Sequence, residues 1–224
     1  MKILDTFFNW RVRWDSLPLL LEGLRLTVLL GGAIIFLSTL LGLVVALVRL
    51  YAPRPLRFLA VIFIDVMRAM PLLVMLVLVY YALPFVGLTL APFTAALWAI
   101  SLVGSAYAAE IFRAGIQAIP RGQLEAAHAL SLNYWSLMGD VVLPQAMRIV
   151  IPPLTNNAIS LIKDTALASV VAMPELLKQA TQQQALAANP TPLIGAALLY
   201  LLLLLPLVRL VVFFEQRFRA ESRS

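Results

Sequence analysis

The sequence predicts an all-α, polytopic membrane protein with five transmembrane helices and one short helix outside the membrane. Hydrophobic residues make up 62% of the 224 positions and charged residues only 12%. A soluble domain usually carries about twice that charged fraction, because its surface must be solvated. Long charge-free runs, one of which covers residues 69–109, are the second observation. Since a membrane-spanning helix needs about 20 apolar residues, we expect a single transmembrane domain over residues 1–224.

Composition also excludes several kinds of site. The chain has no cysteine, which rules out disulfides, thiolate metal sites and cysteine nucleophiles. His128 is its only histidine and cannot build a metal site by itself. The net charge of +6 could point to nucleic acid, but in a membrane protein an excess of Lys and Arg usually marks cytoplasmic loops. We therefore expect no metal site and no nucleic-acid partner.

Apolar runs and their breaks place the spans. Two prolines and three arginines follow the first run and cannot continue in lipid. Pro84, Gly87 and Pro92 divide the long charge-free run into two spans. The spans are expected at about 17–48, 58–83, 92–112, 149–173 and 193–214.

The distribution of Lys and Arg predicts the orientation. Arginines gather in residues 49–68, in residues 110–148 and in the C-terminal tail, whereas the opposite connectors hold only Lys178. The basic N-terminal segment runs against this bias, although Trp10 and Trp14 suggest that it lies at the membrane interface. We expect the N-terminus outside and the C-terminus in the cytoplasm.

The segment 110–148 is unusually polar for a connection between two spans. Pro120 and Gly122 are expected to end the third span, and a short helix is expected at about 121–131, ending by Asn133. Such a helix can dock into a groove of a soluble partner. It can equally lie on the bilayer surface, and periodicity alone favours that alternative.

Motifs in this segment and around it resemble a known family. Glu125-Ala126-Ala127, with the small Ser131 six residues after Glu125 and with Leu143-Pro144-Gln145, resembles the EAA loop of ABC-importer permeases. Further strings resemble the polar amino acid branch of that family; they are Arg68-Ala69-Met70-Pro71-Leu72-Leu73, Glu110-Ile111-Phe112-Arg113-Ala114-Gly115-Ile116 and Leu161-Ile162-Lys163-Asp164-Thr165. The family usually has glycine at the position of Ser131 and commonly serine at that of Ala166.

The resemblance implies the type I permease fold of ABC importers and a set of partners. Two permease subunits, identical or similar, would enclose the path of a polar amino acid, and a periplasmic or lipid-anchored binding protein would deliver it. A dimer of ATPase subunits would bind ATP and Mg, because this chain has no P-loop. We expect no cofactor and no catalytic residues on this chain. The helix at 121–131 would be the coupling helix, which contacts the ATPase through Arg121, Gly122, Glu125, Ala126, Ala127 and Ser131.

Polar residues inside the fourth span are candidates for the substrate path. Ionisable groups at membrane depth tend to line aqueous paths or to pair internally. One interpretation has Lys163, Asp164, Thr165 and Ser169, with Asn157, facing a zwitterionic substrate; the other has Lys163 and Asp164 neutralising each other or lying at a subunit contact. Pro152 and Pro153 predict a kink or break in this span.

Two more charged pairs, at the expected cytoplasmic ends of spans, are candidates for a gate or for internal ion pairs. Asp65 and Arg68 are three residues apart on one helix face, and Glu110 and Arg113 repeat that spacing. We favour an internal pair for Asp65 and Arg68.

The sequence thus predicts the permease subunit of an ATP-driven importer for a polar amino acid in the inner membrane of a bacterium. The alternatives are a permease for another small solute, a small channel and a secondary transporter. Secondary transporters usually contain internal inverted repeats, and we find none in this sequence.

Overall fold

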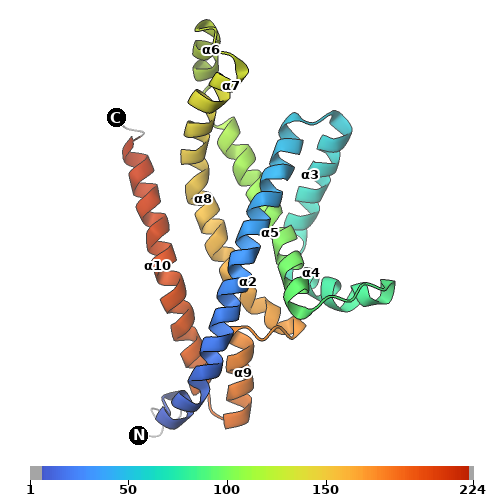
Figure 1. Ribbon diagram of the computed structural model, residues 1–224, viewed down its shortest axis with the longest axis vertical. Helices are drawn as coiled ribbons and strands as arrows, with labels where there is room; N and C mark the ends of the chain where they lie inside the picture. Colours follow the sequence, from blue (N-terminus) through green and yellow to red (C-terminus); the bar gives the residue numbers. More distant parts are fainter. Residues whose placement is uncertain (1–6, 222–224) are drawn as a thin grey trace.

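The computed structural model describes residues 7–221, apart from the side chains of residues 121, 128, 214, 215 and 217–221. The described residues contain helices and turns and no strand, which confirms the all-α class. Within them, four helical stretches are long and apolar enough to cross a membrane, and a bent pair of helices makes a fifth span if it is counted as one. The start of α2 and the end of α10 lie toward opposite ends of the molecule (Figure 1).

Two central helices, α2 (Trp10–Tyr51) and α5 (Pro92–Gln117), pack along each other. The side chain of Asn9 starts α2 by accepting hydrogen bonds from the amides of Arg11 and Val12. A Cβ added at Gly42 of α2 would lie 2.5 Å from the Cβ of Ala108 in α5. The bare backbone at Gly42 therefore lets the two helices touch, as small residues commonly do in membranes.

The expected second span, 58–83, is a bent pair of helices. Helix α3 (Arg54–Ala69) meets the helical stretch Leu72–Val86, which begins with α4 (Leu72–Val77), at an angle of 103°. Met70, the residue before Pro71, is extended with a ψ of 123°, because a following proline disfavours the helical conformation. The chain continues through η1 (Leu78–Ala82) and η2 (Leu83–Val86). This apolar arm projects sideways from the other helices (Figure 1).

The fourth helical stretch is longer than the expected span 149–173, since it runs from Tyr134 to Val171. It consists of α7 (Tyr134–Ser136), the π-helical η3 (Leu137–Val142), α8 (Leu143–Asp164) and η4 (Thr165–Val171). A kink or a break was predicted at Pro152 and Pro153, and helix α8 continues through both residues without a break. Because α5 reaches Gln117 and the fourth long stretch begins at Tyr134, the connection between these two spans is shorter than residues 110–148.

The remaining helices lie at the two ends of the molecule or along its side. Helix α6 (Arg121–Ala129) lies beside α7 at one end, and α9 (Leu176–Ala187) lies at the other (Figure 1). Helix α10 (Thr191–Glu221) runs along the side. The buried carboxylate of Glu175 caps α9 by accepting from the amides of Leu177 and Lys178, and it also accepts from the hydroxyl of Tyr200 at 2.8 Å.

Candidate functional site

A cavity of about 500 Å³ lies at the bend between α3 and α4, where α5 and α8 face it. Polar side chains from three helices line it, amid apolar neighbours: Arg68, Tyr107, Asn157, Ser160 and Asp164. The cavity thus holds one cationic and one anionic group together with neutral hydrogen-bonding groups. Its volume lies within the ~300–1,000 Å³ typical of small-molecule sites.

Arg68 reaches this cavity because α3 ends one residue later, at Ala69. At 1.5 Å per residue, α3 spans only about 24 Å of a hydrocarbon core of about 30 Å. Helix α3 alone is therefore too short to cross the core, and Arg68 lies at its bend with α4. The position of Arg68 at the cytoplasmic end of the span stays a prediction. The predicted pair with Asp65 is absent from the described residues. Instead, the guanidinium of Arg68 lies 5.5 Å from the centre of the Tyr107 ring.

Helix α8 supplies the other polar groups. Asn157, Ser160 and Asp164 follow one another at spacings of three and four residues, which places them on one face of the helix. Glycine at position 104 brings α5 close to that helix, since an added Cβ would lie 2.7 Å from Leu161 Cδ2. The cavity is thus built where a broken span meets a close crossing of α5 and α8.

Three of the five residues predicted for the path lie outside the cavity lining. Lys163 is exposed and points elsewhere, because neighbours on a helix differ in direction by about 100°. Thr165 is fully buried, and its hydroxyl donates to the carbonyl of Ile162 at 2.6 Å. Ser169 is half-buried and does not line the cavity. The other two predicted residues, Asn157 and Asp164, line the cavity. Tyr107 was missed, because an aromatic residue in an apolar span carries no signal of its own.

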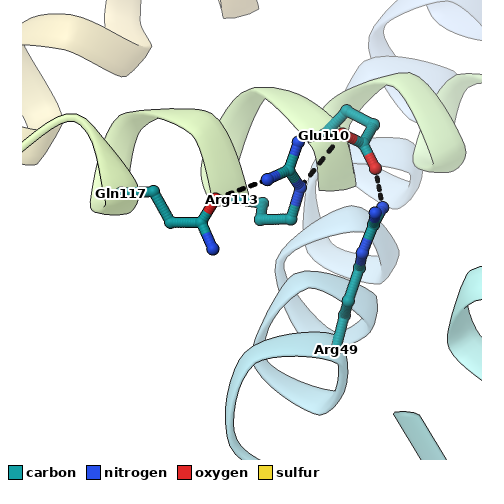
Figure 2. A network of polar contacts seen from close by, with 4 residues as sticks. All are labelled: Arg49, Glu110, Arg113 and Gln117. Carbon is teal, nitrogen blue, oxygen red and sulfur yellow. Dashed lines mark hydrogen bonds and ion pairs between the residues drawn. The ribbon is translucent and has the colours of Figure 1, made fainter.

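A second polar cluster joins α2 to α5 near the opposite end from α9 (Figure 2). Glu110 accepts hydrogen bonds from Arg113 Nε at 3.0 Å and from Nη2 at 2.6 Å, so this pair forms as predicted. Arg113 also donates to Gln117. The same carboxylate pairs with Arg49 of α2. Sequence spacing could not find Arg49, because its partner lies in another helix.

The comparison with known families now decides the class of protein. Residues 38–220 match the family described as binding-protein-dependent transport system inner membrane component. The chain belongs to this family.

Several permeases of bacterial transport systems resemble it over most of their length. A probable amino-acid ABC transporter permease protein of Bacillus subtilis is 39% identical over 176 residues, covering 79% of this chain and 78% of that protein. An arginine transport system permease protein of the same species is 36% identical over 209 residues, with 92% and 95% covered. A glutamine transport system permease protein of Escherichia coli is 36% identical over 184 residues, with 81% and 83% covered.

Solved structures agree in fold. A chain described as an amino acid ABC transporter with histidines superposes with a TM-score of 0.85 and 36% identity, covering 91% of this chain and 95% of that one. A chain of the inward-facing MetNI methionine ABC transporter, 22% identical, superposes with a TM-score of 0.71 and shares the fold.

In this permease, helix α6 presents some of the residues predicted for coupling and buries another. Gly122, Glu125 and Ala126 are exposed. Ala127 is only 4% exposed and packs in a cluster with Leu137 and Val142 of η3. Ala127 therefore holds α6 against η3 and is not available as a surface contact. The side chain of Arg121 lies outside the described part of the structure.

The turn after α6 has a conformation that favours glycine at position 131, where this chain has serine. Ser131 adopts a left-handed conformation with a φ of 56°, and the amide of Leu132 donates to the carbonyl of Ala127 at 3.1 Å. Such a helix end favours glycine. Helix α6 thus ends at Ala129 and not at Asn133, whose side chain instead caps α7 by accepting from the amide of Ser136 at 3.0 Å.

Proposed function

We propose that this permease forms the transmembrane path of an ATP-driven importer for a polar amino acid. The observation that carries the proposal is the cavity at the α3–α4 bend, where Arg68 and Asp164 supply opposite charges. The similar permeases from B. subtilis and E. coli, named for arginine and glutamine transport, support the same substrate class.

The cavity has the groups that a free amino acid needs. A guanidinium binds a carboxylate through paired hydrogen bonds, so Arg68 receives the α-carboxylate. Stacking on Tyr107 limits the directions that this guanidinium can take. Asp164 receives the α-ammonium group, and Asn157 and Ser160 offer neutral hydrogen bonds to the remainder of the substrate.

Energy enters from partner subunits in this proposal. A dimer of ATPases binds ATP and Mg and contacts the exposed residues of α6, including Gly122, Glu125 and Ala126. The permease itself performs no bond chemistry. The Glu110 cluster lies on α5, the helix that leads into α6, and ties it to α2. Motion of α6 is thereby passed to two spans at once, with Glu110 and Arg113 as candidate gate residues.

The remaining partners follow from the same scheme. A second permease, identical or similar, completes the path, and a periplasmic or lipid-anchored binding protein delivers the amino acid. The permease lies in the bacterial inner membrane with its N-terminus outside and its C-terminus in the cytoplasm. Because the chain lacks cysteine, single cysteines introduced at Gln183 and at Gly122 test the orientation: an impermeant thiol reagent added outside should label only the first.

Uptake by reconstituted complexes tests the substrate site. Asp164→Asn and Arg68→Gln should each reduce ATP-driven uptake at least tenfold, the factor that corresponds to about 1.4 kcal/mol, while the adjacent Lys163→Gln should transport normally. Normal uptake by Asp164→Asn would remove Asp164 from the path. Uptake that needs no ATP would point to a channel, and uptake of only non-amino-acid solutes would point to the other substrate classes.

Charge reversal on α6 tests the coupling assignment. Glu125→Lys should lower uptake and separate it from ATP hydrolysis without affecting membrane insertion. Asp15→Lys makes the same charge change at the far end of the molecule and should leave uptake intact. The same ratio of uptake to ATP hydrolysis in Glu125→Lys and Asp15→Lys would contradict a role of Glu125 in coupling.

A further inference from the structure

A narrow groove runs between the first turns of α2 and α10, far from the cavity at the α3–α4 bend. It has a volume of about 90 Å³ and apolar walls that include Leu17, Leu20, Leu198 and Leu199, with Arg13 at its edge. A smaller hollow of about 20 Å³ shares Arg13 and Leu198 with it and lies against Phe7 and Phe8. We call the two together the α2–α10 groove.

Two contacts between α10 and the start of α2 hold this groove in shape. The amide of Asn9, just before α2, donates to Thr191 Oγ1 at the start of α10 at 3.1 Å. Across the groove, a Cβ added at Gly195 would lie 3.0 Å from Leu20 Cδ1. The two helices are thus tied at the polar end and in close contact at a small residue, so the groove between them does not depend on a flexible loop.

The cation at the edge of the groove is Arg13. Among the side chains that the structure describes, no carboxylate lies at ion-pair distance from Arg13. Its guanidinium instead lies 5.8 Å from the ring centre of Trp10, which packs edge to face on Trp14 at 5.5 Å. Exposed tryptophans at the end of a span mark the level of the lipid headgroups. Arg13 therefore lies at headgroup level, above apolar walls that belong to membrane-spanning helices.

A cation at the edge of an apolar groove suits a ligand that has an anionic head and an apolar tail. A lipid phosphate is the anion available at headgroup level, and an acyl chain suits the leucine walls below it. We propose that the α2–α10 groove binds an anionic phospholipid, with its phosphate on Arg13 and part of one acyl chain along Leu17, Leu20 and Leu198. The bound anion also offsets the basic residues that the N-terminal segment carries against the usual charge bias.

Native mass spectrometry of the purified permease tests the site. The full chain is reconstituted in phosphatidylcholine with or without phosphatidylglycerol, and the lipids retained on gentle activation are counted. Wild type should retain phosphatidylglycerol over phosphatidylcholine. Arg13→Gln should lower that preference about fivefold, the effect of one cation near an anionic surface. Arg13→Lys should keep most of it, and Arg11→Gln, which removes a neighbouring cation outside the groove, should keep all of it.

A second variant tests the apolar part. Leu198→Trp fills the groove from its exposed side and should displace the lipid while the melting temperature in phosphatidylcholine stays unchanged. Equal retention of the two lipids by wild type, or unchanged retention in Arg13→Gln or Leu198→Trp, overturns the proposal. Displacement of the lipid by glycerol phosphate alone would mean that the site takes a free phosphate and not a lipid.

Discussion

Arg49, at the last turn of α2, forms an ion pair with Glu110 near the end of α5, and Glu110 shares its carboxylate with Arg113 (Figure 2). All three side chains are about a fifth to a quarter exposed. One acid thus holds two cations at the end of the bundle where α5 leads into α6. This relationship connects the segment that leads into α6 with α2, the longest helix among the described residues.

Removal of the shared acid should destabilise this end of the protein. Glu110→Gln leaves Arg49 and Arg113 facing each other without the anion that they share, and we expect a loss of roughly 1.5–3 kcal/mol in the free energy of unfolding, as for hydrogen bonds to charged groups. Thermal unfolding of the purified permease measures it. Arg54→Gln removes an exposed arginine from the neighbouring α3 and should have no comparable effect. Equal melting temperatures for the two variants would contradict the role of the cluster.

Glycine at position 42 should tolerate no side chain. In Gly42→Ala the new Cβ would meet Ala108 Cβ at 2.5 Å and the Ser105 carbonyl at 2.8 Å, and overpacking of this kind costs about 1–3 kcal/mol. Gly32→Ala lies on the same helix with open space around it. We expect a lower melting temperature for Gly42→Ala and an unchanged or slightly higher one for Gly32→Ala. A tolerated Gly42→Ala would mean that α2 and α5 separate readily.

Relief of the left-handed turn should stabilise α6. Ser131→Gly removes the unfavourable contact of a Cβ at a φ of 56°, which costs roughly 1 kcal/mol. Hydrogen exchange of the amides in α6 should slow several-fold. Ser131→Ala keeps the Cβ and should show no gain. Slower hydrogen exchange in both variants would show that loss of the Ser131 hydroxyl, and not relief of the left-handed turn, stabilises α6.

Stability should depend on pH through Glu175, which lies outside the spans. Burial raises the pKa of this carboxyl above its ordinary value, although hydrogen bonds from Leu177, Lys178 and Tyr200 oppose the shift. A raised pKa in the fold means that the native state binds the proton more tightly than the unfolded chain. Glu175 therefore adds to the free energy of unfolding below the ordinary carboxyl pKa of about 4.3. This stabilisation is lost as the pH rises through the higher pKa that the carboxyl has in the fold.

The melting temperature in this pH interval measures that contribution. In Glu175→Gln the dependence on pH should be flatter than in wild type. Glu22→Gln, at an exposed position on α2, should retain the wild-type slope. If the melting temperature of Glu175→Gln changed with pH as steeply as that of wild type, another group would be responsible for the pH dependence.

Motifs and composition were sufficient for the family, the helical class and the short helix after the third span. These properties are local along the chain. Membrane insertion depends on the polarity of about 20 consecutive residues, and the Glu125-Ala126-Ala127 motif needs no knowledge of the fold. The pair of Glu110 with Arg113 was equally accessible, because three residues of helix place both side chains on one face.

The tertiary structure decided which way the polar side chains of the spans point. Residues that are adjacent in sequence, such as Lys163 and Asp164, point to different surroundings, and only the position of α5 determines which one faces the cavity. The bend at Met70 and Pro71 places Arg68 in the lining of the same cavity as Asp164. The sequence by itself therefore determined that this is a membrane permease with polar groups in its spans. The crossing of helices decided which of those groups meet, because side-chain contacts between helices depend on bends and rotations that no local pattern encodes.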